Sequence, residues 1–270
     1  MDNRSEHLEF TLDVAKKAGK IQLSYFGNIS SISKKSNNID LLTNADIESE
    51  NLIISRIKEA YPDHSIVSEE TNSIINNSEY TWIIDPLDGT TNFTHNLPIF
   101  AVSIALKKAD KIICGVVYNP AADKCFYAEN GKGAFLNGKQ IHPTKSTSLS
   151  DCLLATGFPY LHDKKYDLSF TIFKEFYDRT CGLRRLGAAA LDLCFVAMGR
   201  FDGFYEYNLN SWDICAGSLI AHEAGCRVSD WDGNSLPHDG SRILCSNGKI
   251  HSNMVDILTK QEYSIFFSQP

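Results

Sequence analysis

Two helices are predicted in the first sixty residues. Apolar side chains recur at near-helical spacing over residues 8–26 and again over residues 47–57, and Pro62 closes the second stretch. The polar residues 30–42 lie between them and have the composition of a mobile hairpin or loop. The chain is therefore expected to begin with two helices joined by an exposed connection.

After the second helix, the pattern becomes that of β-strands. Two short apolar runs, at residues 64–68 and 82–84, are each followed by acidic residues. Four further segments, separated by turns such as Asn-Pro and Asn-Gly, predict an antiparallel sheet. These segments are residues 101–106, 112–118, 125–128 and 134–136.

A polar connector at residues 143–150 precedes a change of pattern, after which strands and helices alternate. The predicted strands are residues 152–156, 182–186, 201–207 and short segments around 227–228 and 243–244. The predicted helices are residues 167–176, 187–198, 214–224 and 252–259. This pattern predicts an N-terminal α+β half, residues 1–145, and a C-terminal α/β half, residues 146–270.

Composition narrows the possible partners. The 270-residue chain has a formal net charge of -7, so nucleic acid and anionic membranes are not expected to be its main partners. Its beginning lacks the basic-then-apolar signal pattern, and no apolar run reaches membrane-spanning length. The eight cysteines include no C-x-x-C pair and are expected to be reduced core thiols. We therefore expect a soluble, cytoplasmic protein.

The first candidate for chemistry is the segment from Asp85 to Thr91. A buried strand delivers Asp85 to its C-terminal end, and Pro86 is expected to turn the chain so that Asp88 returns to the same side. Two carboxylates in one small volume require a counter-charge, and Mg²⁺ suits a set of oxygen ligands. Gly89 and the two threonines add backbone N–H groups and hydroxyls for an anion. The alternative is a turn whose aspartates only cap the backbone.

Other acidic residues also lie at the ends of predicted elements. Asp46 forms a capping-box pattern with Thr43, Asp213 has the position of an ordinary N-cap, and Glu69 has that of a solvated strand end. The functional alternative for Asp46 is to orient a water molecule. If the strand-end and helix-start acids converge, they form an oxygen site for two or three Mg²⁺ ions, suited to in-line displacement at phosphorus. The converging set is Glu69, Asp85, Asp88 and Asp213.

Taken together, these segments resemble the inositol monophosphatase family, in particular its bacterial inositol-1-monophosphatase branch. Six blocks follow the family in order: residues 40–46, 68–70, 85–93, 185–192, 199–203 and 212–217. The resemblance implies a layered αβαβα sandwich of the inositol monophosphatase and fructose-1,6-bisphosphatase type. It also implies a Mg²⁺-dependent, Li⁺-sensitive phosphomonoesterase that hydrolyses inositol 1-phosphate, commonly as a homodimer.

The resemblance also assigns roles to the acidic residues. It implies a first ion held by Glu69, Asp85, the carbonyl of Leu87 and Asp88. It implies a second ion held by Asp85, Asp88 and Asp213, with Glu69 available for a third. The nucleophile is implied to be metal-bound water polarised by Thr90 and Asp46.

For the substrate, the resemblance implies phosphate contacts at the ions and at the amides of Gly89 and Thr90. It implies that the ring hydroxyls contact Glu206 and the amides around Gly187 and Ala189, with Arg184 as a positive wall. Leu87, Asp88 and Asp213 are implied to face the substrate as well. The chain departs from many members at Ala188, where a hydroxyl is absent, and Lys35 matches the family's loop lysine by distance from Asp46 alone.

Two alternative functions remain open. Fructose-1,6-bisphosphatase activity stays open, because relatives with that activity share the metal-binding blocks. Thr91, Asn92 and Asp192 differ from the residues typical of nucleotide-bisphosphate phosphatases. A non-catalytic regulatory protein on the same fold also stays open, although none of the four carboxylates is missing.

Three other hydrolase or nucleotide-binding patterns fail. A haloacid-dehalogenase phosphatase needs D-x-D, and the two aspartates here are separated by Pro86 and Leu87. Residues 133–139 fit G-x-x-x-x-G-K, but Gln140 replaces the required Ser or Thr and the context is a hairpin. The zinc motif H-E-x-x-H is incomplete, because Cys226 replaces its second histidine.

Overall fold

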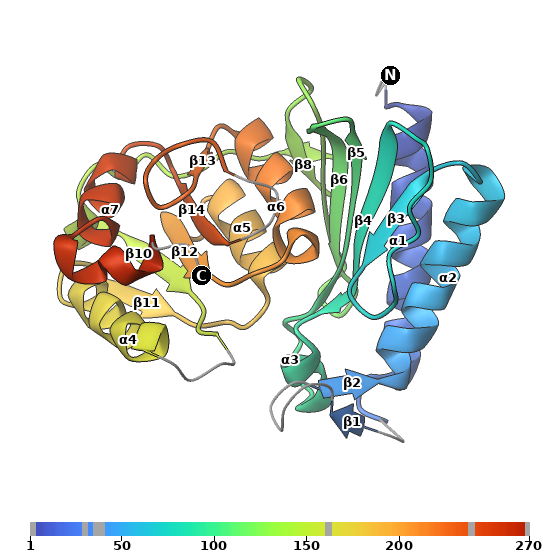
Figure 1. Cartoon of the computed structure of the whole chain (residues 1–270), viewed down its shortest axis with the longest axis horizontal. Helices are drawn as coiled ribbons and strands as arrows, with labels where there is room; N and C mark the ends of the chain where they lie inside the picture. The colour runs from blue at the N-terminus through green and yellow to red at the C-terminus, as the bar shows by residue number, and fades with distance from the viewer. Residues whose placement is uncertain (1–3, 29–31, 35–40, 160–163, 237–240, 268–270) are drawn as a thin grey trace.

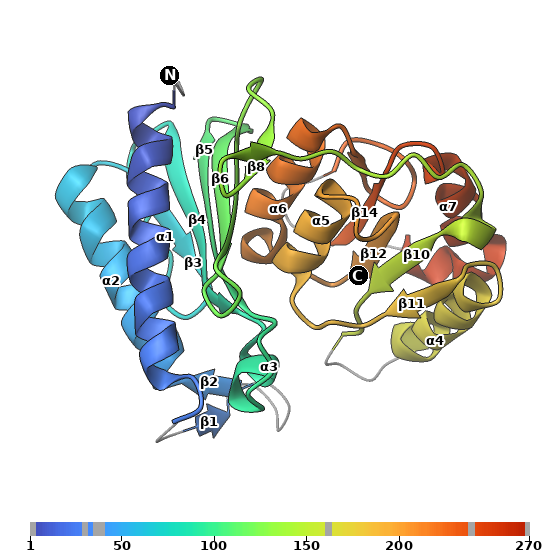
Figure 2. The same cartoon turned by 180° about the vertical axis from the view of Figure 1, so that it is seen from behind.

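The computed structural model describes residues 4–28, 32–34, 41–159, 164–236 and 241–267. Within these residues, two large sheets alternate with three layers of helices (Figures 1 and 2). One helix pair covers the outer face of the first sheet, a second pair lies between the sheets, and further helices cover the far face of the second sheet. This is the layered α/β/α/β/α arrangement expected from the sequence.

The first sheet has the strand order β3-β4-β5-β6-β7-β8-β9. Strand β3 pairs parallel to β4, and all the following pairs are antiparallel, which confirms the predicted meander. Its strands are β3 (Ser65–Ser68), β4 (Tyr80–Asp88), β5 (Ala101–Lys108), β6 (Lys111–Asn119), β7 (Lys124–Glu129), β8 (Ala134–Leu136) and β9 (Lys139–Gln140).

The outer layer consists of α1 (Glu6–Tyr25) and α2 (Asn44–Ala60), both as predicted. Their apolar faces, including Leu8 and Ile53, are buried against Trp82 and its neighbours in the first sheet. The connection between them contains a short antiparallel hairpin of β1 (Ile32–Lys34) and β2 (Leu41–Thr43). Lys35 lies outside the described residues.

The central layer consists of α5 (Ala189–Ala197), which is almost entirely buried, and α6 (Ser211–Ala224), which buries its apolar face. Small residues let these helices approach their neighbours closely. A Cβ on Gly115 of β6 would lie 3.0 Å from the Cα of Ala216, and one on Gly217 would lie 2.9 Å from the Cβ of Leu193. As a result, α6 packs tightly against both the first sheet and α5.

The second sheet has the order β11-β10-β12-β14-β13, with β10 parallel to β11 and β12, and β14 antiparallel to its neighbours. The division into halves at residue 145 stays a prediction. The remaining elements are β10 (Leu153–Thr156), β11 (Gly182–Arg184), β12 (Gly203–Tyr207), β13 (Arg227–Ser229), β14 (Arg242–Ser246), α3 (Thr90–Thr94), α4 (Lys164–Tyr177), α7 (His251–Leu258), η1 (Leu149–Asp151) and η2 (Gln261–Phe266).

All eight cysteines are free thiols, and only Cys181 among them is exposed. Among the described residues, no helix combines the length and the apolar character needed to cross a membrane.

Candidate functional site

The site begins at the C-terminal end of β4. The sequence suggested that Pro86 would turn the chain out of the ladder, but β4 continues to Asp88. The pairing with β5 is instead irregular between Asp85 and Asp88, and this bulge accommodates a residue that has no N–H to donate. The Pro86 carbonyl is held by Nε2 of the buried Gln22, at 2.6 Å. Sequence reasoning missed Gln22, because α1 and β4 are distant in the chain.

Both aspartates of this bulge are buried, with exposed fractions of 1% for Asp85 and 7% for Asp88. Asp85 Oδ1 accepts a hydrogen bond from the Leu87 N–H at 2.9 Å, as in a backbone-capping turn. Asp88 Oδ2 accepts one from the Ala190 N–H at 2.9 Å, at the start of α5. Asp85 therefore caps the turn that follows it, whereas Asp88 binds a segment 102 residues away.

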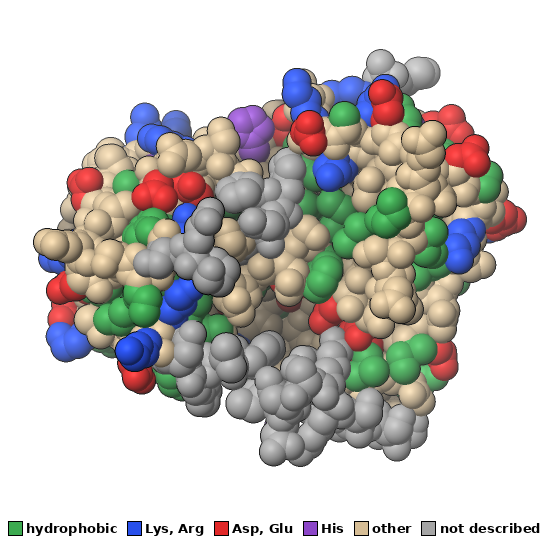
Figure 3. Space-filling view, in the orientation of Figure 1, with side chains coloured by type: hydrophobic (Ala, Val, Ile, Leu, Met, Phe, Trp, Pro, Cys, Tyr) green, Lys and Arg blue, Asp and Glu red, His purple; other side chains and the backbone are tan. Residues whose placement is uncertain are grey.

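The charges of the four expected acids act on one another. Burial raises the pKa of Asp85 well above its usual value, and the charges of Glu69, Asp88 and Asp213 raise it further. Burial raises the pKa of Asp88 to about 8, with Asp213 as the next contribution. The Glu69 side chain is also hydrogen-bonded to Asp85. Figure 3 shows a hollow between the part of the molecule around the first sheet and the part around the second, with acidic side chains at its edge.

The chemistry of these donors fits a hard divalent cation. Neither Asp85 nor Asp88 forms an ion pair with a Lys, Arg or His among the described residues, so nearby cationic side chains do not neutralise them. Among the described residues, no group of three or more His, Cys, Asp or Glu side chains is arranged so that it could hold a metal ion. Binding an ion therefore requires the carboxylates to close around it. Buried oxygen donors of like charge are the set that Mg²⁺ prefers.

Asp46 caps α2 with one carboxylate oxygen and contacts Thr90 with the other. Its Oδ2 accepts hydrogen bonds from the Thr43 N–H at 2.8 Å and the Thr43 hydroxyl at 2.5 Å, which confirms the capping box of α2. Its Oδ1 faces the site, where the hydroxyl of Thr90 donates to it at 3.1 Å. The same hydroxyl lies 3.1 Å from the Leu87 carbonyl. Burial raises the pKa of Asp46 to about 6.

Glu69 is positioned by a residue that sequence reasoning missed. Glu50, on the buried face of α2, accepts hydrogen bonds from the hydroxyl of Ser68 and, at 3.2 Å, from the N–H of Glu70. These two bonds hold the segment on either side of Glu69. The available signal was the spacing of Glu50 four residues after Asp46, which places both acids on one helix face.

The segment after β4 brings backbone groups toward the acids. Gly89 has a φ of +91° and precedes α3, and a Cβ there would lie 2.8 Å from the carbonyl of Ile99. Helix α5 begins at Ala189 rather than at Gly187, because Gly187 has a φ of +80° and Ala188 is extended. The amides of Ala189 and Ala190 face Asp88, and both lower its pKa against the larger effect of burial.

On the opposite side, Glu206 of β12 is half-buried, and burial raises its pKa to about 8. The cation whose charge acts on Glu206 is Arg185, which sequence reasoning did not single out. Arg184 is exposed and donates to its neighbour's carbonyl, that of Leu183, at 2.9 Å. Gly157 was also missed, and a Cβ there would lie 2.0 Å from a Glu206 carboxylate oxygen.

Asp213 lies at the N-terminal end of α6, in the third helical position rather than at the N-cap itself. The N-cap is Asn210, whose N–H donates to Asp213 Oδ2 at 2.6 Å. The Ser103 hydroxyl of β5 donates to the Trp212 carbonyl at 3.3 Å. The start of α6 is thereby attached to the strand next to β4.

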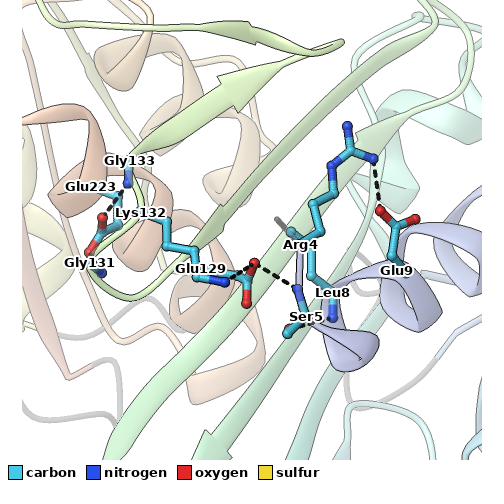
Figure 4. A network of polar contacts seen from close by, with 9 residues as sticks. All are labelled: Arg4, Ser5, Leu8, Glu9, Glu129, Gly131, Lys132, Gly133 and Glu223. Atoms are coloured by element: carbon cyan, nitrogen blue, oxygen red, sulfur yellow. Dashed lines mark hydrogen bonds and ion pairs between the residues drawn. The ribbon is translucent and has the colours of Figure 1, made fainter. Parts of the chain in front are cut away.

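A separate pocket of about 190 Å³ lies near the start of α1 and is lined by residues such as Arg4 and Lys132. Both cations have acidic partners, because Arg4 contacts Glu9 at 3.2 Å and Lys132 contacts Glu129 at 3.1 Å. Figure 4 shows these contacts. The residues that line this pocket therefore help to connect α1 with β7. Their charges are already paired and do not indicate a ligand.

The chain is similar to known proteins over nearly its whole length. The model of the inositol monophosphatase family matches residues 3–263. Among curated relatives, a putative Nus factor SuhB of Neisseria meningitidis is 41% identical over 254 residues, covering 93% of this chain and 97% of the relative. An inositol-1-monophosphatase of Synechocystis is 41% identical over 252 residues, with 93% and 88% covered. A fructose-1,6-bisphosphatase/inositol-1-monophosphatase of Thermotoga maritima is 34% identical over 255 residues, with 94% and 96% covered.

Solved structures give the same result. The extragenic suppressor protein suhB from Bartonella henselae superimposes with a TM-score of 0.91 at 38% identity, covering 95% of this chain and 100% of that one. A structure named as an IMPase/NADP phosphatase complexed with Mg²⁺ and phosphate has a TM-score of 0.81 at 25% identity, with 91% and 92% covered. Sequence and fold agree, and the chain belongs to the inositol monophosphatase family.

Proposed function

We propose that this protein is a Mg²⁺-dependent phosphomonoesterase that hydrolyses inositol 1-phosphate to inositol and phosphate. The observation that supports the proposal is that the charges of Glu69, Asp88 and Asp213 all act on the buried carboxyl of Asp85 and raise its pKa. Burying like charges together is costly unless a cation compensates them. Several curated relatives are named inositol-1-monophosphatase, which supports the choice of substrate.

Two or three Mg²⁺ ions would be held by side-chain and backbone oxygens. The residues are Glu69, Asp85, Leu87 through its carbonyl, Asp88 and Asp213. When bound, such ions neutralise phosphate charge and lower the pKa of water toward neutrality. In the structure with Mg²⁺ and phosphate named above, a family fold holds both components.

Thr90 and Asp46 would hold the proton of the attacking water. Thr90 Oγ1 lies 3.1 Å from both the Asp46 carboxylate and the Leu87 carbonyl, and when its hydrogen is donated to Asp46 its lone pairs are left to accept a hydrogen bond from that water. The Asp46 carboxylate is fixed by the two Thr43 bonds, so the Thr90 hydroxyl is held in one orientation. This arrangement orients a water without a strong protein base.

The substrate would lie across the hollow between the two halves. Its phosphate would contact the amides of Gly89 and Thr90, and its hydroxyls would contact Glu206 and the amides around Gly187 and Ala189. Leu87, Asp88 and Asp213 would line the phosphate side, and Arg184 would contribute positive charge. We also propose inhibition by Li⁺ and a homodimeric state.

Two other functions are distinguished by experiment. The Thermotoga relative's name favours fructose 1,6-bisphosphate as a second substrate. The Neisseria relative's name favours a regulatory protein on the same fold. Retention of all four carboxylates supports an enzyme, because a purely regulatory protein does not need them.

The test is phosphate release from the purified full-length protein, with Mg²⁺ or with EDTA. Inositol 1-phosphate, fructose 1,6-bisphosphate, NADP and adenosine bisphosphate are compared at equal concentration, with Asp85→Asn as the inactive control. Mg²⁺-dependent release that is fastest with inositol 1-phosphate supports the proposal. Absence of release from every phosphate ester tested refutes it.

A further inference from the structure

Asn92 connects the metal-binding motif to the segment opposite it. This side chain, 7% exposed, lies in α3. Its Nδ2 donates to the carbonyl of Ile99 and to the carbonyl of Leu186, both at 2.8 Å, and lies 3.5 Å from the carbonyl of Gly187. Asn92 and Leu186 are 94 residues apart in the chain. A single buried amide group therefore holds two distant segments together.

Two further contacts join the same two segments. Asp88 Oδ2 accepts a hydrogen bond from the Ala190 N–H at 2.9 Å. A Cβ on Gly89 would lie 3.3 Å from the Cβ of Ala188, so these backbones are in close approach. Residues 88–92 and 186–190 are thus aligned side by side, and we call this alignment the seam.

The seam joins the two parts of the proposed site. Residues 88–90 belong to its phosphate side, and residues 187–189 belong to its hydroxyl side. At the end near the proposed metal ligands, the two segments of the seam are attached by Asp88. At the other end, the attachment is the Asn92 amide, and Gly187 with its φ of +80° lies next to it. The position of the hydroxyl-binding amides relative to the phosphate therefore depends on Asn92.

The hydrogen-bond chemistry at this position requires a donor. Both acceptors are backbone carbonyls, and only a group with two N–H bonds satisfies both at once. A carboxylate of the same shape would place negative charge against two carbonyl oxygens. We propose that Asn92 is a positioning residue that sets the distance between phosphate and polyol contacts, and thereby selects a polyol phosphate.

This inference rests on the proposed function and is tested with two substrates. In Asn92→Asp, kcat/KM for inositol 1-phosphate is compared with kcat/KM for p-nitrophenyl phosphate, which has no hydroxyl groups to position. The ratio of the two is expected to fall by about tenfold or more, mainly through a higher KM for inositol 1-phosphate. If Asn92→Asp does not fold, Asn92→Ala removes the donor without adding charge.

The matched control is Asn247→Asp. Asn247 is 5% exposed, and its Nδ2 also donates to two oxygens, those of the Thr144 hydroxyl and the Ser146 carbonyl, both at 2.9 Å. This variant loses similar buried bonds away from the site, so its substrate ratio should equal that of the wild type. Amide hydrogen exchange of residues 186–188 provides a readout that does not require activity, and it should accelerate in Asn92→Asp alone.

The outcomes separate the two proposals. If the wild type releases no phosphate from any ester, the proposed function fails, and the exchange rates still decide the role of Asn92. An unchanged substrate ratio in an active Asn92 variant overturns the inference. Unchanged exchange at residues 186–188, or an equal fall of the ratio in Asn247→Asp, overturns it as well.

Discussion

Thr90 donates a hydrogen bond to Asp46 at 3.1 Å, although the two residues lie on different helices and 44 positions apart. Because the other oxygen of Asp46 caps α2, one carboxylate contributes to both helix stability and the site. Function and stability are therefore expected to change together when it is replaced.

The first prediction concerns this pair. Asp46→Ala should lower kcat by about 10²-fold or more, because the Thr90 hydroxyl loses its orientation. It should also lower the free energy of unfolding by about 1 kcal/mol through loss of the cap. Steady-state kinetics and urea unfolding measure the two effects. Ser5→Ala is the control, since Ser5 caps α1 by accepting from the Leu8 N–H and lies outside the site. Equal loss of kcat in both variants would contradict the assigned role.

The second prediction concerns the space beside Glu206. In Gly157→Ala, the new methyl group should displace the Glu206 carboxylate, because the two would overlap. The KM for inositol 1-phosphate should rise about tenfold, as expected when a polar contact is lost. Adding Glu206→Asp shortens the acid by one methylene group and should recover part of the loss. A double variant no better than Gly157→Ala would show that displacement of this carboxylate is not the cause.

The third prediction concerns metal removal. Asp88 has a folded pKa of about 8 against about 4 when unfolded, so the folded state binds more protons between these values. Without metal, stability should therefore fall as pH rises from about 4 to about 8, unless other groups compensate. Mg²⁺ should raise the melting temperature more at pH 8 than at pH 6. Thermal unfolding in EDTA and in Mg²⁺ measures this, and Asp88→Asn should reduce the difference. A Mg²⁺ effect that is largest at pH 6 would argue against this model.

The fourth prediction concerns His251, a fully buried histidine far from the acids in sequence. Its two ring nitrogens contact the hydroxyls of Ser229 at 2.8 Å and Ser246 at 2.9 Å, and burial lowers its pKa to about 4. The unfolded chain binds a proton below about 6.5, so this group's contribution to stability should be lost as pH falls from about 6.5 to about 4. His251→Gln should flatten the urea-unfolding profile over this range. An unchanged slope would exclude His251 as its source.

Local pattern was sufficient for much of the fold. The helices α1 and α2, the capping box of Thr43 and Asp46, and the turns of the first sheet depend on neighbours in sequence, and the structure has them as predicted. Pro86 was misjudged because a bulge, which requires the partner strand β5, lets the strand continue.

The supporting residues of the site could not be read from the sequence. Gln22, Glu50 and Gly157 act through contacts with segments at least 18 positions away, and among them only Glu50, four residues after Asp46, had a local signal. Arg185 and Arg184 are adjacent, and only the folded structure shows that the charge of Arg185 acts on Glu206.

Helix α6 is attached to the first sheet at both ends. Near its start, the Trp212 carbonyl is bound by Ser103, and near its end, Glu223 accepts from the N–H groups of Gly131 and Gly133 at 2.7 and 2.8 Å. Its 14 residues span about 21 Å, and one inserted residue would rotate its two ends by about 100° relative to each other. Evolution within the family is therefore free to lengthen surface loops, while insertions and deletions inside this helix should be selected against.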